Sequence, residues 1–134
     1  MKKLIPLYAL LFLASCSMLM PTYEYKKALA TTTAQKWSPG VQNAGRGVTF
    51  RVTFFQLDEL KADTLWVNGI PLETEITRVG DTTYITSFVH ATEQNPSTLV
   101  KEDVFTGKLQ LLVKDKKKEL DLGNFKQLPP TEYP

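Results

Sequence analysis

Hydrophobic and polar residues alternate along much of the chain, and this alternation predicts β-strands. Between Val48 and Phe54, the apolar side chains Val, Phe, Val and Phe alternate with Thr, Arg and Thr. A period of two carried by β-branched and aromatic residues is typical of a strand that buries one face. We therefore predict the first strong strand over Val48–Leu57.

Six further segments carry strand signals and are separated by turn residues. They are Thr64–Val67, Ile70–Leu72, Glu75–Val79, Thr82–Ala91, Thr106–Lys114 and Glu119–Leu122. Asn68-Gly69 between apolar residues is the strongest short-range signal for a β-hairpin. Pro71 lacks an N–H group, so its strand is expected at a sheet edge. The segment Thr82–Ala91 is apolar on both faces, which favours a central strand.

Short strands, frequent turns and little helical periodicity predict an all-β domain. The expected fold is an immunoglobulin-like β-sandwich of about seven short antiparallel strands, preceded by a cleaved signal helix and a flexible tether. The chain contains one cysteine, so no intrachain disulfide can form and the core must rest on packing. The predicted core consists of Phe50, Val52, Phe54, Leu65, Val67, Ile85, Val89, Leu109, Leu111 and Leu120.

The first fifteen residues have the layout of a secretion signal. Two lysines after Met1 give a positive start, and Leu4–Leu13 is an apolar run. The length of this run falls within the roughly 7–15 residues of a signal-peptide core. It is too short to span a bilayer, which needs about 20 residues. The small residues Ala14 and Ser15 then precede Cys16.

The run Leu13-Ala14-Ser15-Cys16 resembles the lipobox of bacterial lipoproteins, in which leucine, two small residues and cysteine end the signal. The resemblance implies cleavage between Ser15 and Cys16, and a diacylglyceryl group on the Cys16 thiol with acyl chains such as palmitate. Several acyl chains give stable anchoring, since each buried methylene contributes about 0.8 kcal/mol. An uncleaved anchor helix and a secretory signal cut elsewhere remain as alternatives.

The residues after the cysteine bear on the destination of the protein. In lipoproteins of enteric bacteria, an aspartate directly after the cysteine favours retention at the inner membrane. Ser17 stands there instead, so the resemblance implies the outer membrane. Ser17–Met20 also lacks the acidic residues that route some lipoproteins to the cell surface. A periplasm-facing body is therefore expected, with the cell surface as the alternative.

Over about half of its length, the chain is also similar to small uncharacterised lipoproteins of the Bacteroidetes. The similarity rests on Lys36-Trp37, on the glycine-rich stretch Gly40–Gly47, and on Leu65–Gly69. It implies the same lipid-anchored β-domain and adds no activity.

Four segments are expected along the chain. Residues 1–15 form the lipoprotein signal peptide, and residues 16–34 form the lipidated N-terminus and tether. Residues 35–128 form the β-sandwich domain, with a turn-rich loop at its start. The proline-rich residues 129–134 are expected to be a frayed C-terminus.

Charge argues against nucleic acid as a partner. Of the sixteen Lys and Arg residues, Lys2 and Lys3 lie in the signal, and the others balance the fourteen Asp and Glu residues. A nucleic-acid-binding protein needs a basic stripe that displaces counterions from phosphates. A formally neutral mature chain does not supply one.

No set of residues in the sequence forms a catalytic or metal-binding motif. His90 is the only histidine and sits in a predicted strand, where packing is the simpler interpretation. Zinc sites need clustered Cys and His residues, which are absent. Asp58, Glu59 and Asp63 lack the loop pattern of a calcium site. The acid pairs Glu73 with Glu75 and Asp58 with Glu59 are ordinary in a chain with fourteen acidic residues. We therefore expect no enzyme, no metal and no cofactor.

Two surface features are candidates for binding. Trp37, Trp66 and Tyr84 are candidates for an aromatic sheet face that binds a glycan or a partner protein, although core packing would also account for them. The lysines of Lys114–Lys118 are expected at a hairpin tip, as a solvated turn or as a contact with anionic lipid headgroups. Our leading hypothesis is a non-enzymatic binding or assembly module whose partner is another envelope protein or a glycan. The alternative is a glycan-binding accessory lipoprotein.

Overall fold

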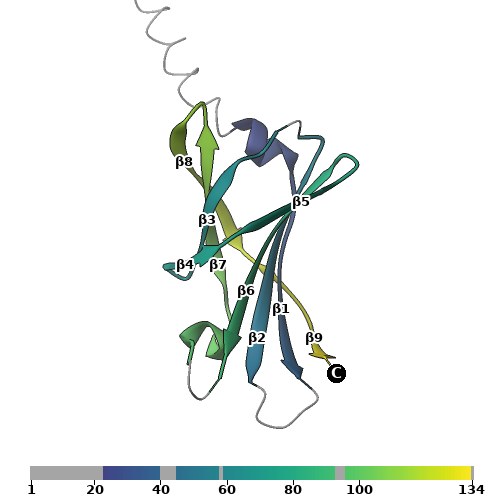
Figure 1. Ribbon diagram of the computed structural model, residues 1–134, viewed down its shortest axis with the longest axis vertical. Coiled ribbons are helices and arrows are strands. Elements are labelled where there is room, and N and C mark those ends of the chain that lie inside the picture. Colours follow the sequence, from purple (N-terminus) through teal and green to yellow (C-terminus); the bar gives the residue numbers. More distant parts are fainter. Residues whose placement is uncertain (1–22, 40–44, 58, 93–95, 134) are drawn as a thin grey trace, which may run out of the picture.

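The protein is a sandwich of two β-sheets, shown by a computed structural model that describes residues 23–39, 45–57, 59–92 and 96–133 (Figure 1). A short helix over residues 23–28 precedes the first strand. The five-stranded sheet contains β5 (Glu75–Val79), β6 (Thr82–Ala91), β2 (Arg46–Phe55), β1 (Leu29–Pro39) and β9 (Lys126–Tyr133), in that order. The four-stranded sheet contains β4 (Ile70–Glu73), β3 (Ala62–Val67), β7 (Thr106–Val113) and β8 (Lys116–Asn124), in that order. A 3₁₀ helix, η1 (Thr98–Lys101), lies between β6 and β7.

The strand order confirms the immunoglobulin-like sandwich. Immunoglobulin domains place their first, second, fifth and fourth strands in one sheet and their third, sixth and seventh in the other. Here β4 is counted as an additional strand beside the third strand, β3. The first sheet then contains β1, β2, β6 and β5, and the second contains β3, β7 and β8. The described residues contain nine strands rather than about seven, because β1 and β9 are added to the seven predicted from the sequence. The pairing of β1 with β9 is parallel, unlike the antiparallel arrangement expected throughout.

The core lies between the two sheets, as the alternation of residues predicts. All ten predicted core residues are buried. In β2, Val48, Phe50, Val52 and Phe54 are fully buried on the inner face, while Arg51 points outward and is exposed. The structure adds six buried hydrophobic residues that the prediction lacked. They are Ala34, Val48, Leu99, Phe105, Leu122 and Phe125.

The first strand starts earlier than the sequence predicts. β1 begins at Leu29, so residues 29–34 belong to the sandwich and not to the tether expected over 16–34. Residues 37–39 likewise continue this strand instead of opening a loop. The misassignment has a physical cause: β1 pairs on both sides, with β2 and β9, yet Ala34 is its only fully buried hydrophobic side chain among the described residues. Backbone pairing therefore holds β1 without a hydrophobic alternation.

The C-terminal segment is also more ordered than the prediction of a frayed end over 129–134. β9 continues through Tyr133 and pairs with β1, and residue 134 lies outside the described residues. Pro129 and Pro130 are tolerated because β9 is an edge strand, where a missing N–H group costs no ladder bond. The register shifts at the prolines, and the Gln35 side-chain amide donates to the Pro129 carbonyl at 3.0 Å.

The hairpin at Asn68-Gly69 is confirmed, and Asn68 does more than turn the chain. Asn68 and Gly69 have φ of 50° and 80°, the left-handed conformation of a two-residue turn between β3 and β4. The Asn68 side-chain amide donates to the Val104 carbonyl at 3.0 Å, and its oxygen accepts from the Thr106 N–H at 2.9 Å. One side chain thus fixes the start of β7. β4 lies at the sheet edge, as Pro71 predicts.

Removing this side chain should loosen the start of β7. Asn68→Ala loses both hydrogen bonds and places alanine, which tolerates positive φ less well than asparagine, in the turn, so the free energy of unfolding should fall by about 1–2 kcal/mol. Asn68→Asp is the matched control, because it keeps the acceptor for Thr106 and tolerates positive φ. Denaturant unfolding should rank the wild type above Asn68→Asp and Asn68→Asp above Asn68→Ala. Equal stability of all three would contradict the assigned role.

Candidate functional site

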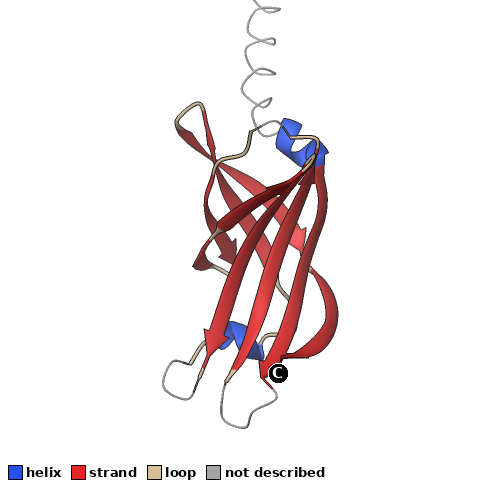
Figure 2. Cartoon of the chain, turned by 45° about the vertical axis from the view of Figure 1, so that its right-hand side comes forward, coloured by secondary structure: helices blue, strands red, loops and turns tan. Residues whose placement is uncertain are grey.

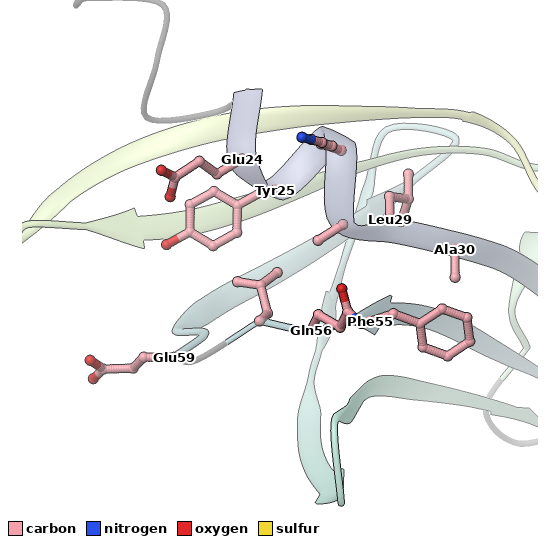
Figure 3. A pocket seen from close by; sticks show the side chains of 10 residues that line it. Glu24, Tyr25, Leu29, Ala30, Phe55, Gln56 and Glu59 are labelled. Atoms are coloured by element: carbon pink, nitrogen blue, oxygen red, sulfur yellow. The ribbon is translucent and has the colours of Figure 1, made fainter.

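One pocket of about 480 Å³ lies at the end of the sandwich where the described chain begins. The helix over 23–28 and the first residues of β1 form one wall, and the end of β2 with the following connection forms the other (Figure 3). The pocket is lined by Glu24, Tyr25, Lys27, Ala28, Leu29, Ala30, Phe55, Gln56, Leu57 and Glu59. It combines apolar side chains with three charged ones, and it is open to solvent.

The local chain geometry explains why the two walls face each other. Gln56 has φ of 56°, so β2 ends abruptly and the chain turns away from the sheet. Its N–H donates to the Asp81 carbonyl at 2.8 Å, which ties this turn to the β5–β6 hairpin. Leu57 and Leu60 then pack against the core together with Tyr25 and Ala28 of the helix. Burial of these apolar residues holds the helix against the sandwich.

Tyr25 is the one described residue whose acid–base behaviour is clearly altered. Partial burial raises the pKa of the Tyr25 phenol above its ordinary value of 10.0, and the nearby carboxylates of Glu24 and Glu59 raise it further. Figure 3 shows the phenol ring on the same side of the pocket as the Glu24 and Glu59 carboxylates. Lys61 forms an exposed ion pair with Glu59, with Nζ and Oε1 separated by 3.7 Å. The phenol is therefore neutral under ordinary conditions and can act as a hydrogen-bond donor.

The pocket lining contains no Ser, Thr, Cys or His side chain, and its polar side chains are those of Glu24, Tyr25, Lys27, Gln56 and Glu59. Within the described ranges, no group of three or more His, Cys, Asp or Glu side chains could hold a metal ion. Of the acidic residues considered for calcium, Glu59 and Asp63 form separate ion pairs with Lys61 and Lys117, and Asp58 lies outside the described residues. The arrangement is suited to binding through apolar contact and hydrogen bonding.

The three aromatic residues predicted to bind a ligand do not form one site. Trp37 lies on β1 and Tyr84 on β6, both on the outer face of the five-stranded sheet. Trp66 lies on β3 of the opposite sheet, 36% exposed, between Pro71 and Lys108. A single ligand-binding surface that uses all three residues would have to pass through the core.

Trp37 has a packing role on that outer face. In register, Trp37 of β1 and His90 of β6 flank Gly47 of β2, and their rings stack with centroids 5.4 Å apart and planes inclined by 25°. A β-carbon at Gly47 would overlap the Trp37 ring. The only histidine is therefore part of an aromatic stack across a glycine.

The other candidates are also separated. Arg51 lies over the Tyr84 ring, with its guanidinium carbon 5.5 Å from the ring centroid. Glu73 and Glu75 stand on β4 and β5, which belong to different sheets. Glu73 instead takes part in holding the sheets together, since its carbonyl accepts from the buried Ser87 hydroxyl at 2.7 Å.

Sequence reasoning missed the pocket because its walls lie about thirty residues apart and one of them was assigned to the tether. Lys114–Lys118 was correctly expected at a hairpin, although the turn itself is at Lys114 and Asp115, with φ of 50° and 65°. Several large apolar side chains are exposed on the outer face of the five-stranded sheet. Phe55 is 53%, Phe88 62% and Val79 64% exposed.

Ser15 and Cys16, the predicted cleavage and lipidation residues, lie outside the described residues. No helix among the described residues is long and apolar enough to cross a membrane. Neither the models of known protein families nor the curated proteins contain a match to this chain.

The surroundings of Tyr25 predict a late step in its titration. Because the folded pKa lies above the unfolded value of 10.0, this group stabilises the fold below about pH 10 and loses that contribution as pH rises through the folded pKa. Tyrosinate absorbance should show that Tyr25→Phe removes the late-titrating phenol. Glu59→Gln should lower the Tyr25 pKa, while Glu102→Gln, away from the pocket, should not. A titration curve unchanged in shape by Glu59→Gln would contradict this.

The stack over Gly47 predicts a strong effect of one methyl group. Gly47→Ala should lower the free energy of unfolding by about 1–3 kcal/mol, because the new β-carbon overlaps the Trp37 ring and the Val89 carbonyl. Thr49→Ala on the same strand and face is the control, with an expected change within about 1 kcal/mol. Chemical denaturation measures both. Equally small decreases in stability for Gly47→Ala and Thr49→Ala would contradict the prediction, because the Trp37 ring would then move aside freely.

Proposed function

We propose that this protein is a lipid-anchored lipoprotein of the bacterial cell envelope, and that its sandwich is a non-enzymatic binding or assembly module. The observation that carries the proposal is the sequence Leu13-Ala14-Ser15-Cys16 after a charged start and an apolar run. The thiol of Cys16 accepts the lipid, and acyl chains inserted in the bilayer hold the body at the membrane surface.

Three features of the body support this proposal. The sandwich contains no cysteine, so the Cys16 thiol has no partner within the chain. The described chain begins at one end of the sandwich, where a tether can attach without crossing a sheet (Figure 2). The exposed side chain of Phe88, on the outer face of the five-stranded sheet, provides apolar surface of the kind that protein partners cover.

The outer membrane is the proposed location, with the body facing the periplasm. Ser17 in place of an aspartate supports this sorting. The sandwich then works as a holder or adaptor for another envelope component, such as a protein or a glycan. No catalytic group, metal or cofactor is part of the proposal.

Metabolic labelling tests the anchor. Cells that express the full chain with an alkyne analogue of palmitate should incorporate the label, and the band should fractionate with membranes. Cys16→Ser should abolish labelling and leave the unprocessed chain, because the hydroxyl cannot replace the thiolate nucleophile. Ser17→Asp is a second variant, expected to keep the label and to shift the protein toward the inner membrane. Labelling that survives Cys16→Ser would overturn the proposal.

A further inference from the structure

Four segments meet at the end of the sandwich where the described chain begins. They are the helix over 23–28, the β2–β3 connection, the β5–β6 turn and the β7–β8 turn, and we call them together the N-terminal end (Figures 1 and 2). Hydrogen bonds join them: the Gln56 N–H donates to Asp81 at 2.8 Å, and the Leu112 N–H to Lys61 at 2.9 Å. The pocket joins the helix to the same connection. The N-terminal end is therefore one continuous surface.

Large apolar side chains are exposed on this surface. Phe55 and Val79 lie on either side of Thr82 in adjacent strands, and they are 53% and 64% exposed. Tyr23, in the helix, is 63% exposed. Aromatic residues that combine an apolar ring with a polar tip are enriched at the level of lipid headgroups. Phe55, Val79 and Tyr23 are exposed at this end of the sandwich, and we call them the apolar rim.

Lysines accompany these side chains. In the β7–β8 hairpin, Lys114, Lys116 and Lys117 are exposed, and the run from 114 to 119 contains four lysines against Asp115 and Glu119. The charge of Lys117 is partly offset by Asp63, with Nζ and Oδ2 3.6 Å apart. The helix adds two exposed lysines, at positions 26 and 27. Lysines held near an anionic lipid surface are attracted to it within a Debye length.

The position of the tether selects a bilayer as the occupant of this surface. The seven residue-to-residue steps from Cys16 to Tyr23 span at most about 25 Å when fully extended. The inference rests on the proposed lipid anchor, which keeps this end, and not the opposite one, close to the membrane. We infer that the N-terminal end docks on the anionic surface of the bilayer that holds the lipid. Phe55 and Val79 enter the headgroup layer, and the lysine hairpin lies over the phosphates.

Docking of this kind fixes the orientation of the body. Amphipathic surfaces of proteins bury their apolar side chains about 5–10 Å into the headgroup boundary, and anionic lipids strengthen the binding. The long axis of the sandwich would then rise from the membrane, since the N-terminal end lies at one extreme of that axis. The opposite end, with η1 and the end of β9, would face a partner away from the membrane.

The experiment uses the full chain, purified from membranes with its lipid and reconstituted into vesicles. Because the lipid occupies Cys16, a single introduced cysteine is the only free thiol. Val79→Cys carries an environment-sensitive fluorophore at the N-terminal end, and Lys101→Cys carries it on η1 at the other end. The vesicles contain phosphatidylcholine alone or mixed with phosphatidylglycerol, and nitroxide lipids serve as quenchers.

The label at residue 79 should shift to shorter wavelength and be quenched in the vesicles with phosphatidylglycerol. Both effects should disappear at 1 M salt, where the Debye length is about 3 Å. The emission wavelength and the quenching of the label at residue 101 should be the same in all vesicles. Lys114→Glu with Lys116→Glu should weaken the docking equilibrium by roughly thirtyfold or more. Lys101→Glu with Lys108→Glu makes the same change of net charge away from this end and should leave the label at residue 79 unchanged.

Three results would overturn the inference. The fluorescence of the label at residue 79 could be unchanged by phosphatidylglycerol, or the label at residue 101 could be quenched as much as the label at residue 79. The two charge-reversal pairs could also weaken docking equally. Circular dichroism shows that each variant is folded. Flotation of the chain with vesicles reports the anchor separately. A chain that does not float would contradict the proposed lipid anchor. Adding Cys16→Ser would then keep residue 79 as the only labelled thiol, so that its label with added vesicles still measures docking.

Discussion

The contact of Phe50 with Phe105 and Phe125 is the interaction on which the sandwich depends. Phe50 is fully buried in the central strand β2, and the other two rings meet it edge-on, with centroids 5.0 and 5.4 Å away. The Phe125 N–H donates to the Phe105 carbonyl at 2.8 Å, so the two segments are also joined to each other. Such ring pairs contribute about 0.5–1.5 kcal/mol beyond burial. Antibody domains link their sheets with a disulfide, and here aromatic packing joins them instead.

This cluster also explains the course of the chain after β8. Phe125 fills the space over Gly107, where a β-carbon would overlap its ring. Anchored there, the chain leaves the four-stranded sheet at Asn124 and enters the five-stranded sheet at Lys126. β9 then covers the edge of β1, and its prolines present few N–H groups to a further strand. A further strand therefore finds few backbone N–H groups to pair with at this edge of the sheet.

The N-terminal end and the outer face of the five-stranded sheet carry different kinds of side chain. The N-terminal end carries the pocket beside Tyr25, an apolar rim and the lysine hairpin. The outer face of the five-stranded sheet carries Phe88, the Trp37–His90 stack and the Tyr84–Arg51 pair. If the proposed anchor holds the N-terminal end at the membrane, the sheet face stays available to a partner.

The sequence by itself determined which face of most strands is buried, because a period of two places each side chain on the inner or outer face without further information. This alternation identified the ten predicted core residues. The Asn-Gly pair identified the turn at residues 68 and 69, and Pro71 identified the edge position of β4. Only the tertiary structure decided the fate of β1 and β9, since both are held by pairing with neighbours distant in sequence. The same holds for the pocket and for the separation of Trp66 from Trp37 and Tyr84, which depend on which strands share a sheet. The local pattern of residues determines which face of a strand is buried, whereas pairing between distant segments determines which strands are neighbours.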